Sequence, residues 1–207
     1  MNLVSPEEKD PLEPLWNKAT QAGNAGDFPG LIFAWRALVE HGVVQVCAHI
    51  GQVYETGGEG IEKDINQALF WYRRAVFECD DPLAHLGLGR AYYNGVGEVK
   101  NIEQARKHFE AAHSYGLPQA RIYLGVMYYF GNGVECDVEL AKKYLESAAA
   151  DGFAYAYLLL ARFALHERRL FKAISGAVKG CLLIKKIADK DPTDPRLLGI
   201  EIPLKKQ

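Results

Sequence analysis

A glycine within a predicted helix recurs at a nearly constant interval, and this recurrence constrains the fold more than any other feature of the chain. Gly51, Gly89 and Gly125 lie 38 and 36 residues apart. Each follows an Ile or a Leu, precedes a tyrosine by three residues, and leads into a Gly-rich turn. Intervals of this length are typical of proteins built from stacked helix pairs. The three segments are residues 50–57, 88–95 and 124–131.

A second helix is predicted in each repeat after the Gly-rich turn. Its alanines and large rings follow an i, i+3, i+7 spacing, which places them on one face of a helix. A polar residue able to accept a backbone N–H opens this helix, glycine closes it in two repeats, and proline stands at the start of the next helix. The corresponding residues are Ala68, Ala105 and Ala141; Trp71, His108 and Tyr144; Ala75, Ala112 and Ala148; the caps Asp64, Asn101 and Asp137; and Gly116, Gly152, Pro82 and Pro118.

Each repeat is therefore predicted to be an antiparallel helix pair. Glycine inside a helix costs roughly 1 kcal/mol relative to alanine, so its presence needs a reason. We expect Gly51, Gly89 and Gly125 to let the second helix approach closely, opposite the first alanine of that helix. One pair cannot bury its apolar faces alone, and stacking of successive pairs creates the core.

The best-preserved repeat carries a longer pattern that resembles a known family. Residues 120–134 read Ala-x3-Leu-Gly-x2-Tyr-x2-Gly-x-Gly-Val, and residues 137–152 read Asp-x3-Ala-x2-Tyr-x3-Ala-x3-Gly. This resembles the Sel-one-like repeat, a relative of the tetratricopeptide repeat, over residues 44–152. The resemblance implies an all-α fold: a right-handed α-solenoid, or α/α superhelix, of about five antiparallel helix pairs, with the terminal pairs degenerate.

The flanking segments are predicted to cap the stack as imperfect copies. In the last copy Ala161 replaces the helix glycine, and residues 166–169 replace the Gly-rich turn. Atypical terminal repeats are required at the open ends of a solenoid. The predicted organisation is one solenoid domain over 1–207: a degenerate N-terminal pair at 11–43, repeats at 44–80, 81–116 and 117–152, a degenerate C-terminal capping repeat at 153–190, and a tail at 191–207.

Composition excludes several other classes of protein. In this chain of 207 residues, 49% are hydrophobic and 24% are charged, which argues against intrinsic disorder. The net charge of -2 gives no general attraction to nucleic acid. No run approaches the roughly 18–20 apolar residues of a membrane span, and residues 1–10 lack the features of a secretory signal. The four cysteines form no CxxC pair, so we expect reduced, mostly buried thiols in a cytoplasmic protein.

No catalytic or metal site is predicted, and no cofactor. The chain has no HExxH, GxSxG or Walker-type motif. We expect His108 to pack as a hydrogen-bonded core residue, and His49 and His85 to lie on the surfaces of neighbouring first helices without binding a metal. Some relatives of this repeat were considered to bind or hydrolyse β-lactams, but those are exported and carry a regular cysteine pair in each repeat. This chain has neither feature, so the resemblance implies no enzyme.

The resemblance also implies where a partner binds, because in this solenoid class the first helices line the concave surface. If the repeated glycine and tyrosine are packing positions, residues one, four and five after the glycine face the groove. Arg, Tyr and Phe at such positions are typical of interface hot spots. Two alternatives stay open: Tyr93 and Tyr129 pack against the next repeat, and Phe130 covers the seam between repeats. The predicted residues are Gln52, Glu55, Thr56, Arg90, Tyr93, Asn94, Val126, Tyr129, Phe130, Arg162, Leu165 and His166.

The predicted function is therefore a non-catalytic scaffold or adaptor, in a bacterial setting, that binds a segment of another protein in its groove. A first alternative is an inhibitory or immunity-type protein that binds one toxin or enzyme. A second is a hydrolase acting on a β-lactam or a cell-wall substrate. No membrane or nucleic-acid partner is expected, and the oligomeric state is left open.

The C-terminal region is basic in an otherwise acidic chain. Residues 168–207 hold ten Lys or Arg and four Asp or Glu, a net charge of +6, which leaves -8 for residues 1–167. A solvated helix face, a docking surface and a nucleic-acid contact are all compatible with this pattern. The apolar tail at 197–204 is expected either to pack on the last helix or to enter a groove.

Overall fold

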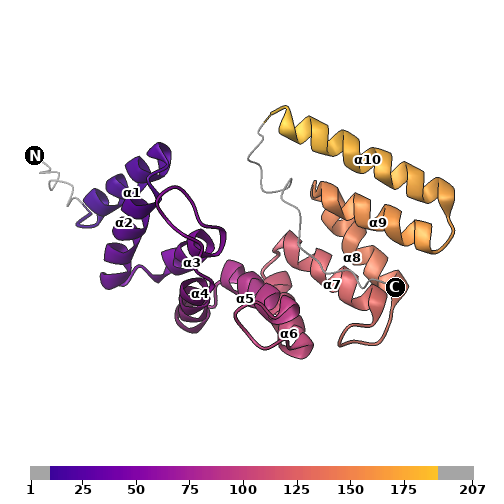
Figure 1. The fold of residues 1–207 in the computed structure, drawn as a ribbon, viewed down its shortest axis with the longest axis horizontal. Coiled ribbons are helices and arrows are strands. Elements are labelled where there is room, and N and C mark those ends of the chain that lie inside the picture. Colours follow the sequence, from indigo (N-terminus) through magenta and orange to yellow (C-terminus); the bar gives the residue numbers. More distant parts are fainter. Residues whose placement is uncertain (1–9, 191–207) are drawn as a thin grey trace, which may run out of the picture. The chain divides into compact units, whose positions relative to one another are not determined.

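A computed structural model describes residues 10–190, which form helices joined by short turns (Figure 1). The predicted tail at 191–207 lies outside the described residues. Within the described range there is no strand, and successive helices pack as antiparallel pairs, which confirms the predicted all-α fold of about five pairs. The elements are α1 (Glu13–Ala25), α2 (Phe28–Glu40), a 3-10 turn η1 (Val44–Val46), α3 (Cys47–Thr56), α4 (Ile65–Cys79), α5 (Pro82–Asn94), α6 (Ile102–Ser114), α7 (Pro118–Phe130), α8 (Val138–Ala150), α9 (Ala154–His166) and α10 (Leu170–Ala188).

The described residues divide into two compact units, which meet between residues 87 and 88, inside α5. In the described part, the first unit holds α1 to α4 and the beginning of α5. The second unit holds the rest of α5 and α6 to α10. The predicted single solenoid domain and its internal boundaries stay predictions.

Close helix crossings at the repeated glycines are confirmed in three helix pairs. A Cβ built on Gly89 would lie 2.6 Å from Cε1 of Phe109, which is fully buried. The same atom on Gly125 would lie 2.9 Å from Cγ of Leu145 and 3.1 Å from the carbonyl oxygen of Ala141. On Gly51 it would meet the ring of Tyr72 at 2.8 Å. The glycines therefore provide the space into which the second helix packs.

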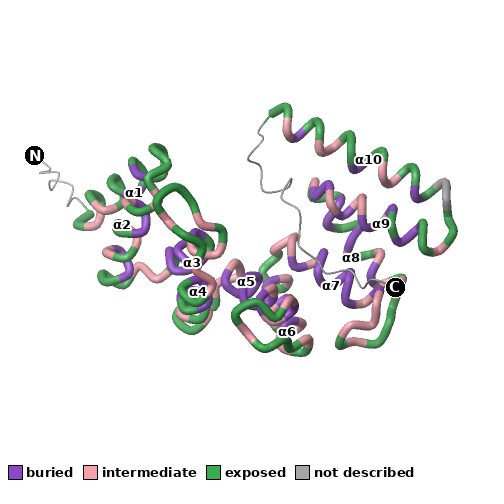
Figure 2. Tube along the Cα trace, viewed as in Figure 1, coloured by how far each residue is buried: buried purple, intermediate pink, exposed green. Residues whose placement is uncertain are grey.

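The closest neighbours of these glycines are residues that the sequence analysis did not single out. Tyr72, Phe109 and Leu145 are almost completely buried, and each lies four residues after the first repeated alanine of its second helix. Figure 2 shows the buried residues along the facing sides of the paired helices. The predicted ring positions differ in depth: Trp71 is buried, whereas His108 is half-buried and stacks on Tyr92, with ring centroids 5.7 Å apart.

Helix ends follow the predicted capping residues. Asp64, Asn101 and Asp137 each accept a hydrogen bond from the backbone N–H three residues later, at 2.9–3.0 Å. Such caps satisfy an N–H group that has no partner inside the helix. Gly116 and Gly152 have φ values of 82° and 89°, the left-handed conformation that terminates a helix with little strain.

The last helix pair brings its backbones together with glycines placed on the other helix. A Cβ on Gly176 would lie 3.1 Å from Cβ of Ala161, and one on Gly180 would lie 2.9 Å from Leu158. The first helix, α9, carries Ala161 where the earlier pairs have glycine. In the turn before α10, Arg168 takes the left-handed conformation, with φ at 58°, which a glycine would adopt more readily.

Two expectations about burial are wrong, one for His85 and one for the cysteines. His85 is buried, with 7% of its surface exposed, and its Nε2 lies 2.7 Å from Oδ1 of Asp80. It therefore packs at the start of α5 instead of lying on the helix surface. The cysteines are not mostly buried: Cys47 is buried, Cys79 is half-buried, and Cys136 and Cys181 are exposed.

At the helix crossing, a Gly→Ala substitution should destabilise the protein, whereas the same substitution elsewhere in a helix usually stabilises it. Gly89→Ala should lower the free energy of unfolding by about 1–3 kcal/mol, because the added methyl group overlaps Phe109 in a filled core. Gly23 in α1 is the matched control, because its Cβ would meet only Leu31, at 3.9 Å. Gly23→Ala should instead stabilise by about 0.5–1 kcal/mol through helix propensity. Urea unfolding measures both, and equal signs for the two variants would contradict the crossing.

Alkaline pH should destabilise the protein partly through Cys47. Burial raises the pKa of this thiol to about 11 from an ordinary 9.0. The unfolded chain loses the thiol proton near pH 9 while the folded chain keeps it, so stability present below pH 9 falls as pH rises towards 11. The expected contribution is about 2–3 kcal/mol. Urea midpoints from pH 8 to 11 should fall less steeply for Cys47→Ala, whereas Cys136→Ala should keep the original slope.

Candidate protein-binding surface

Tyr129, near the end of α7, joins α7 to α9 in the second unit. Its ring stacks on Phe163 with centroids 3.5 Å apart and planes inclined by 12°. Its hydroxyl lies 3.0 Å from Nδ1 of His166 and 3.4 Å from the carbonyl oxygen of Phe163. Only 7% of Tyr129 is exposed. The side chain therefore fixes the position of the last turn of α9.

Tyr93 plays the corresponding part between α5 and α7. Its ring contacts Phe109 and Tyr123, with centroids 6.2 and 6.1 Å away, and 2% of the residue is exposed. Nδ2 of Asn132 donates a hydrogen bond to the Tyr93 hydroxyl at 3.3 Å. Asn132 lies between two glycines of the turn after α7. The sequence placed it in a turn, but gave no signal that it would reach back to α5.

Burial separates the predicted groove residues into two groups. Tyr93, Val126 and Tyr129 lie inside the second unit and pack against neighbouring helices. This is the packing alternative left open by the sequence for the two tyrosines. Phe130 is half-buried and sets its ring edge-on to Tyr129 and Phe163, so it covers the seam between α7 and α9.

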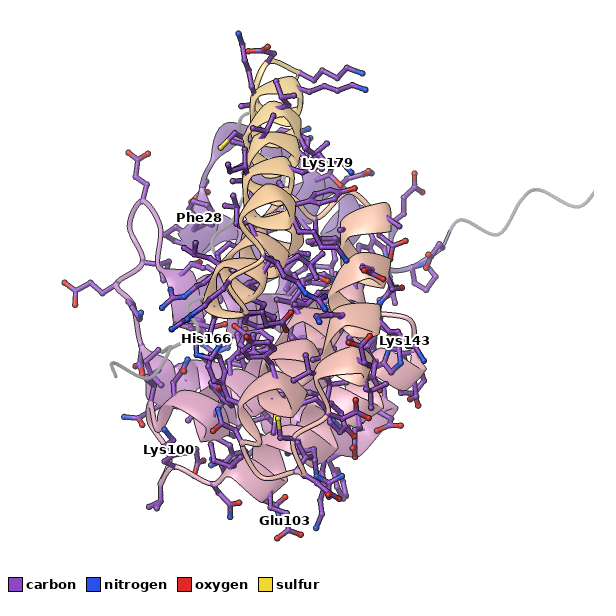
Figure 3. All side chains as sticks on the ribbon, turned by 90° about the vertical axis from the view of Figure 1, so that its right-hand side faces the viewer. Phe28, Lys100, Glu103, Lys143, His166 and Lys179 are labelled. Carbon is purple, nitrogen blue, oxygen red and sulfur yellow. The ribbon has the colours of Figure 1, made fainter. Side chains whose placement is uncertain are left out.

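The exposed part of the predicted site in the second unit lies on α9. Arg162, Leu165 and His166 are all exposed, and their i, i+3, i+4 spacing places them on one side of the helix. Leu165 exposes 59% of its surface, a large fraction for an aliphatic side chain. In Figure 3, His166 lies to one side of α10 and Lys143 of α8 to the other. We call Phe130, Arg162, Leu165 and His166 the α9 surface.

The remaining predicted residues lie on α5 and α3. Arg90 and Asn94 are half-buried in the second unit. In the first unit Gln52 and Thr56 are exposed, and the Thr56 hydroxyl donates to the carbonyl oxygen of Gln52 at 3.0 Å. Glu55 accepts a hydrogen bond from the Tyr72 hydroxyl at 2.7 Å, so it also holds α3 to α4.

The buried tyrosines are structural hydrogen-bonding groups. Burial raises the pKa of Tyr129, and nearby Glu167 raises it further. Burial also raises the pKa of Tyr93, although the hydrogen bond from Asn132 partly opposes this. Both phenols therefore stay neutral at physiological pH and serve to position helices.

Residues 10–190 contain no group of three His, Cys, Asp or Glu side chains arranged to hold a metal ion. In the same range, none of the helices combines the length and the hydropathy needed to cross a bilayer. What the α9 surface offers is an apolar contact beside a guanidinium and an imidazole. Such a set can make apolar, charged and hydrogen-bonding contacts with another molecule.

Successive antiparallel helix pairs with glycine crossings and aromatic contacts between pairs define an α-helical repeat protein. The family model of the Sel1 repeat matches residues 44–76, 82–112 and 118–153. Through these three repeats the chain belongs to the Sel1 repeat family, which confirms the resemblance seen in the sequence. Among proteins of curated function, none matches this chain.

Solved structures with the same fold come from several bacteria. A protective antigen of uropathogenic Escherichia coli with an SLR fold is 28% identical, with a TM-score of 0.61 over 76% of this chain, which spans only 35% of the antigen's length. A Sel1 repeat protein from Oxalobacter formigenes is 23% identical, with a TM-score of 0.63, covering 86% of this chain and 82% of its own. An immunity protein from Pseudomonas aeruginosa is also 23% identical, with a TM-score of 0.55 and coverages of 86% and 69%. The last two likenesses concern the fold alone.

Substitutions at Tyr129 should separate its packing from its hydroxyl. Tyr129→Phe keeps the stack on Phe163 and should cost about 0.5–1.5 kcal/mol of stability. Tyr129→Ala should cost about 3–5 kcal/mol, because it leaves a cavity between α7 and α9. Tyr115→Ala is the control, since Tyr115 is 56% exposed and a change at such a surface site stays within about 0.5 kcal/mol. Urea unfolding would contradict this role of Tyr129 if its alanine variant matched the control.

Proposed function

We propose that the protein is a non-catalytic scaffold or adaptor that binds a segment of a partner protein through its first helices. Sel1 repeats are typically protein-interaction modules, and this supports the coarse part of the proposal. The observation that carries it further is the α9 surface: an exposed leucine between an arginine and a histidine, on a helix end fixed from behind by Tyr129. A rigid support favours binding because little side-chain order is lost on association.

The buried members of the predicted site take a supporting part in this proposal. Tyr93, Val126 and Tyr129 position the helices, while Phe130, Arg162, Leu165 and His166 contact the partner in the second unit. Arg90 and Asn94 extend the contact along α5. Gln52, Glu55 and Thr56 are proposed as the equivalent positions on the first unit.

An immunity-type role is the second candidate. One protein of the same fold is a bacterial immunity protein, and an immunity protein would form a tight one-to-one complex with a single toxin or enzyme. We infer a cytoplasmic protein in a bacterial cell in either case. Two exposed free thiols, Cys136 and Cys181, favour a reducing compartment. No arrangement of side chains described above favours a β-lactam or cell-wall hydrolase.

The test compares two double variants in quantitative affinity purification, followed by titration calorimetry with the recovered partner. Arg162→Ala with Leu165→Ala should weaken binding by at least about tenfold, since two central contacts are lost. Lys107→Ala on α6 with Tyr115→Ala just after α6, both at exposed positions, should change binding less than about twofold. Alanine variants at Tyr93 or Tyr129 are unsuitable, because they would destabilise the packing that supports the surface.

Circular dichroism melts establish that both double variants stay folded. Unchanged affinity of the Arg162 and Leu165 variant would contradict the proposed surface. A stoichiometric complex with a single toxin or enzyme would select the immunity-type role, whereas several partners would select the adaptor.

A further inference from the structure

A groove separate from the α9 surface runs between α8 and α10, above α9, in the second unit. It encloses about 460 Å³. Lys142 lies on one wall, Lys172 and Lys179 lie on the other, and Tyr157 and Leu160 of α9 form an apolar floor. A neighbouring hollow of about 290 Å³ shares Tyr157 and Lys179 and continues along α10.

Three lysines follow this groove at a constant interval. Lys172, Lys179 and Lys186 lie seven residues apart on α10, so they occupy one side of the helix and are separated by about 10 Å per step. Lys172 lines the larger groove, Lys186 lines the neighbouring hollow, and Lys179 lines both. This row contains part of the basic C-terminal region whose role the sequence left open.

The row has no acidic partner of its own among residues 10–190, where no carboxylate lies within ion-pair distance of Lys172, Lys179 or Lys186. Glu167, at the end of the groove, is already engaged: it lies 3.1 Å from Nζ of Lys142 and 3.7 Å from Arg169. Burial opposes the charge of Lys142, but hydrogen bonds to Glu167 and Glu139 raise its pKa overall. Glu146 of α8 also lines the groove, so its wall carries two carboxylates against the four cations Lys142, Arg169, Lys172 and Lys179. The groove therefore presents an excess of positive charge beside apolar surface.

The wall that carries the lysines is held close to its floor. Gly176 and Gly180 let α10 approach α9 until a Cβ at either position would meet α9 atoms at 2.9–3.1 Å. These glycines lie on the side of α10 that faces α9, next to the lysine row. The close packing of α10 on α9 consequently fixes the distance between the lysine row and the apolar residues Tyr157 and Leu160.

We propose that this groove binds an acidic segment of a partner protein that also carries apolar side chains. Its carboxylates would pair with Lys172, Lys179 and Lys186, and its apolar groups would contact Tyr157, Leu160 and Leu183. Charge complementarity selects the acidic residues, and the apolar floor selects a peptide over a nucleic-acid backbone, which offers phosphates and polar sugars but no apolar side chains. This site is additional to the α9 surface and does not depend on it.

The experiment uses a random dodecapeptide library displayed on phage. The library is first depleted on the full-length Lys172→Glu, Lys179→Glu variant and then selected on the full-length wild-type chain, so that retained peptides depend on the lysine row. The peptides should be enriched in Asp and Glu and contain at least one large apolar residue. Synthetic copies should perturb the NMR signals of α8, α9 and α10 residues around the groove.

Matched variants set the expected size of the effect. Lys172→Gln with Lys179→Gln should weaken the selected peptides by about tenfold, from the loss of two charge contacts. Lys143→Gln removes an exposed α8 lysine outside the groove and should change affinity by less than about twofold. Raising the salt concentration should weaken binding to wild type, because exposed charges are screened.

Several results would overturn the proposal. These are the recovery of no peptide, recovery of peptides without acidic enrichment, equal weakening by Lys143→Gln, or NMR changes confined to other helices. A single-stranded oligonucleotide that binds with the same lysine dependence would assign the row to nucleic acid. Tighter peptide binding by a chain ending at Lys190 would assign the groove to residues 191–207 of the protein itself.

Discussion

The close crossing of the two helices within a pair is the constraint on which the rest of the structure depends. At Gly51, Gly89 and Gly125 no room exists for a Cβ, because a ring or a leucine of the second helix occupies that space. The short distance lets one side chain of the second helix fill the interior of its pair. It also fixes how far the outer residues of the first helix lie from the second helix.

In the second unit, aromatic rings pack between successive helix pairs and hold them in position. Tyr93 rests on Phe109 and Tyr123, and Tyr129 rests on Phe163, each with a hydroxyl bonded to a polar residue near the end of the next helix or turn. The exposed residues of α9 therefore project from a helix held by both stacking and hydrogen bonding. The α8–α10 groove is positioned in the same manner by glycines of α10. Both candidate binding regions therefore depend on buried contacts: the α9 surface on the packing of Tyr129, and the groove on the close approach of α10 to α9.

The sequence predicted the helix pairs, their caps and their crossings, because each depends on residues a fixed number of positions apart. It was less informative about which side of a first helix stays accessible. Tyr93, Val126 and Tyr129 occupy positions that the family resemblance assigned to the groove, but contacts between pairs bury them. The hydrogen bond from Asn132 to Tyr93 joins residues 39 positions apart, so no local pattern reveals it. The burial of His85 was missed for a different reason: its partner Asp80, only five residues earlier, takes the left-handed conformation at the end of α4, which the sequence pattern did not indicate.

At the α9–α10 crossing the glycine lies on the second helix and the alanine on the first, the reverse of Gly51 with Ala68 and of Gly125 with Ala141. Where Ala161 stands in the first helix, Gly176 stands opposite it in the second, so the two side chains together stay small. A sequence pattern written one position at a time records only the glycine, and the family match ends at residue 153 although a further helix pair follows. A repeat in which the glycine lies on the opposite helix is recognised more readily from the combined volume of the two facing side chains than from the residue at one position. The boundary of such a family in sequence therefore need not be its boundary in structure.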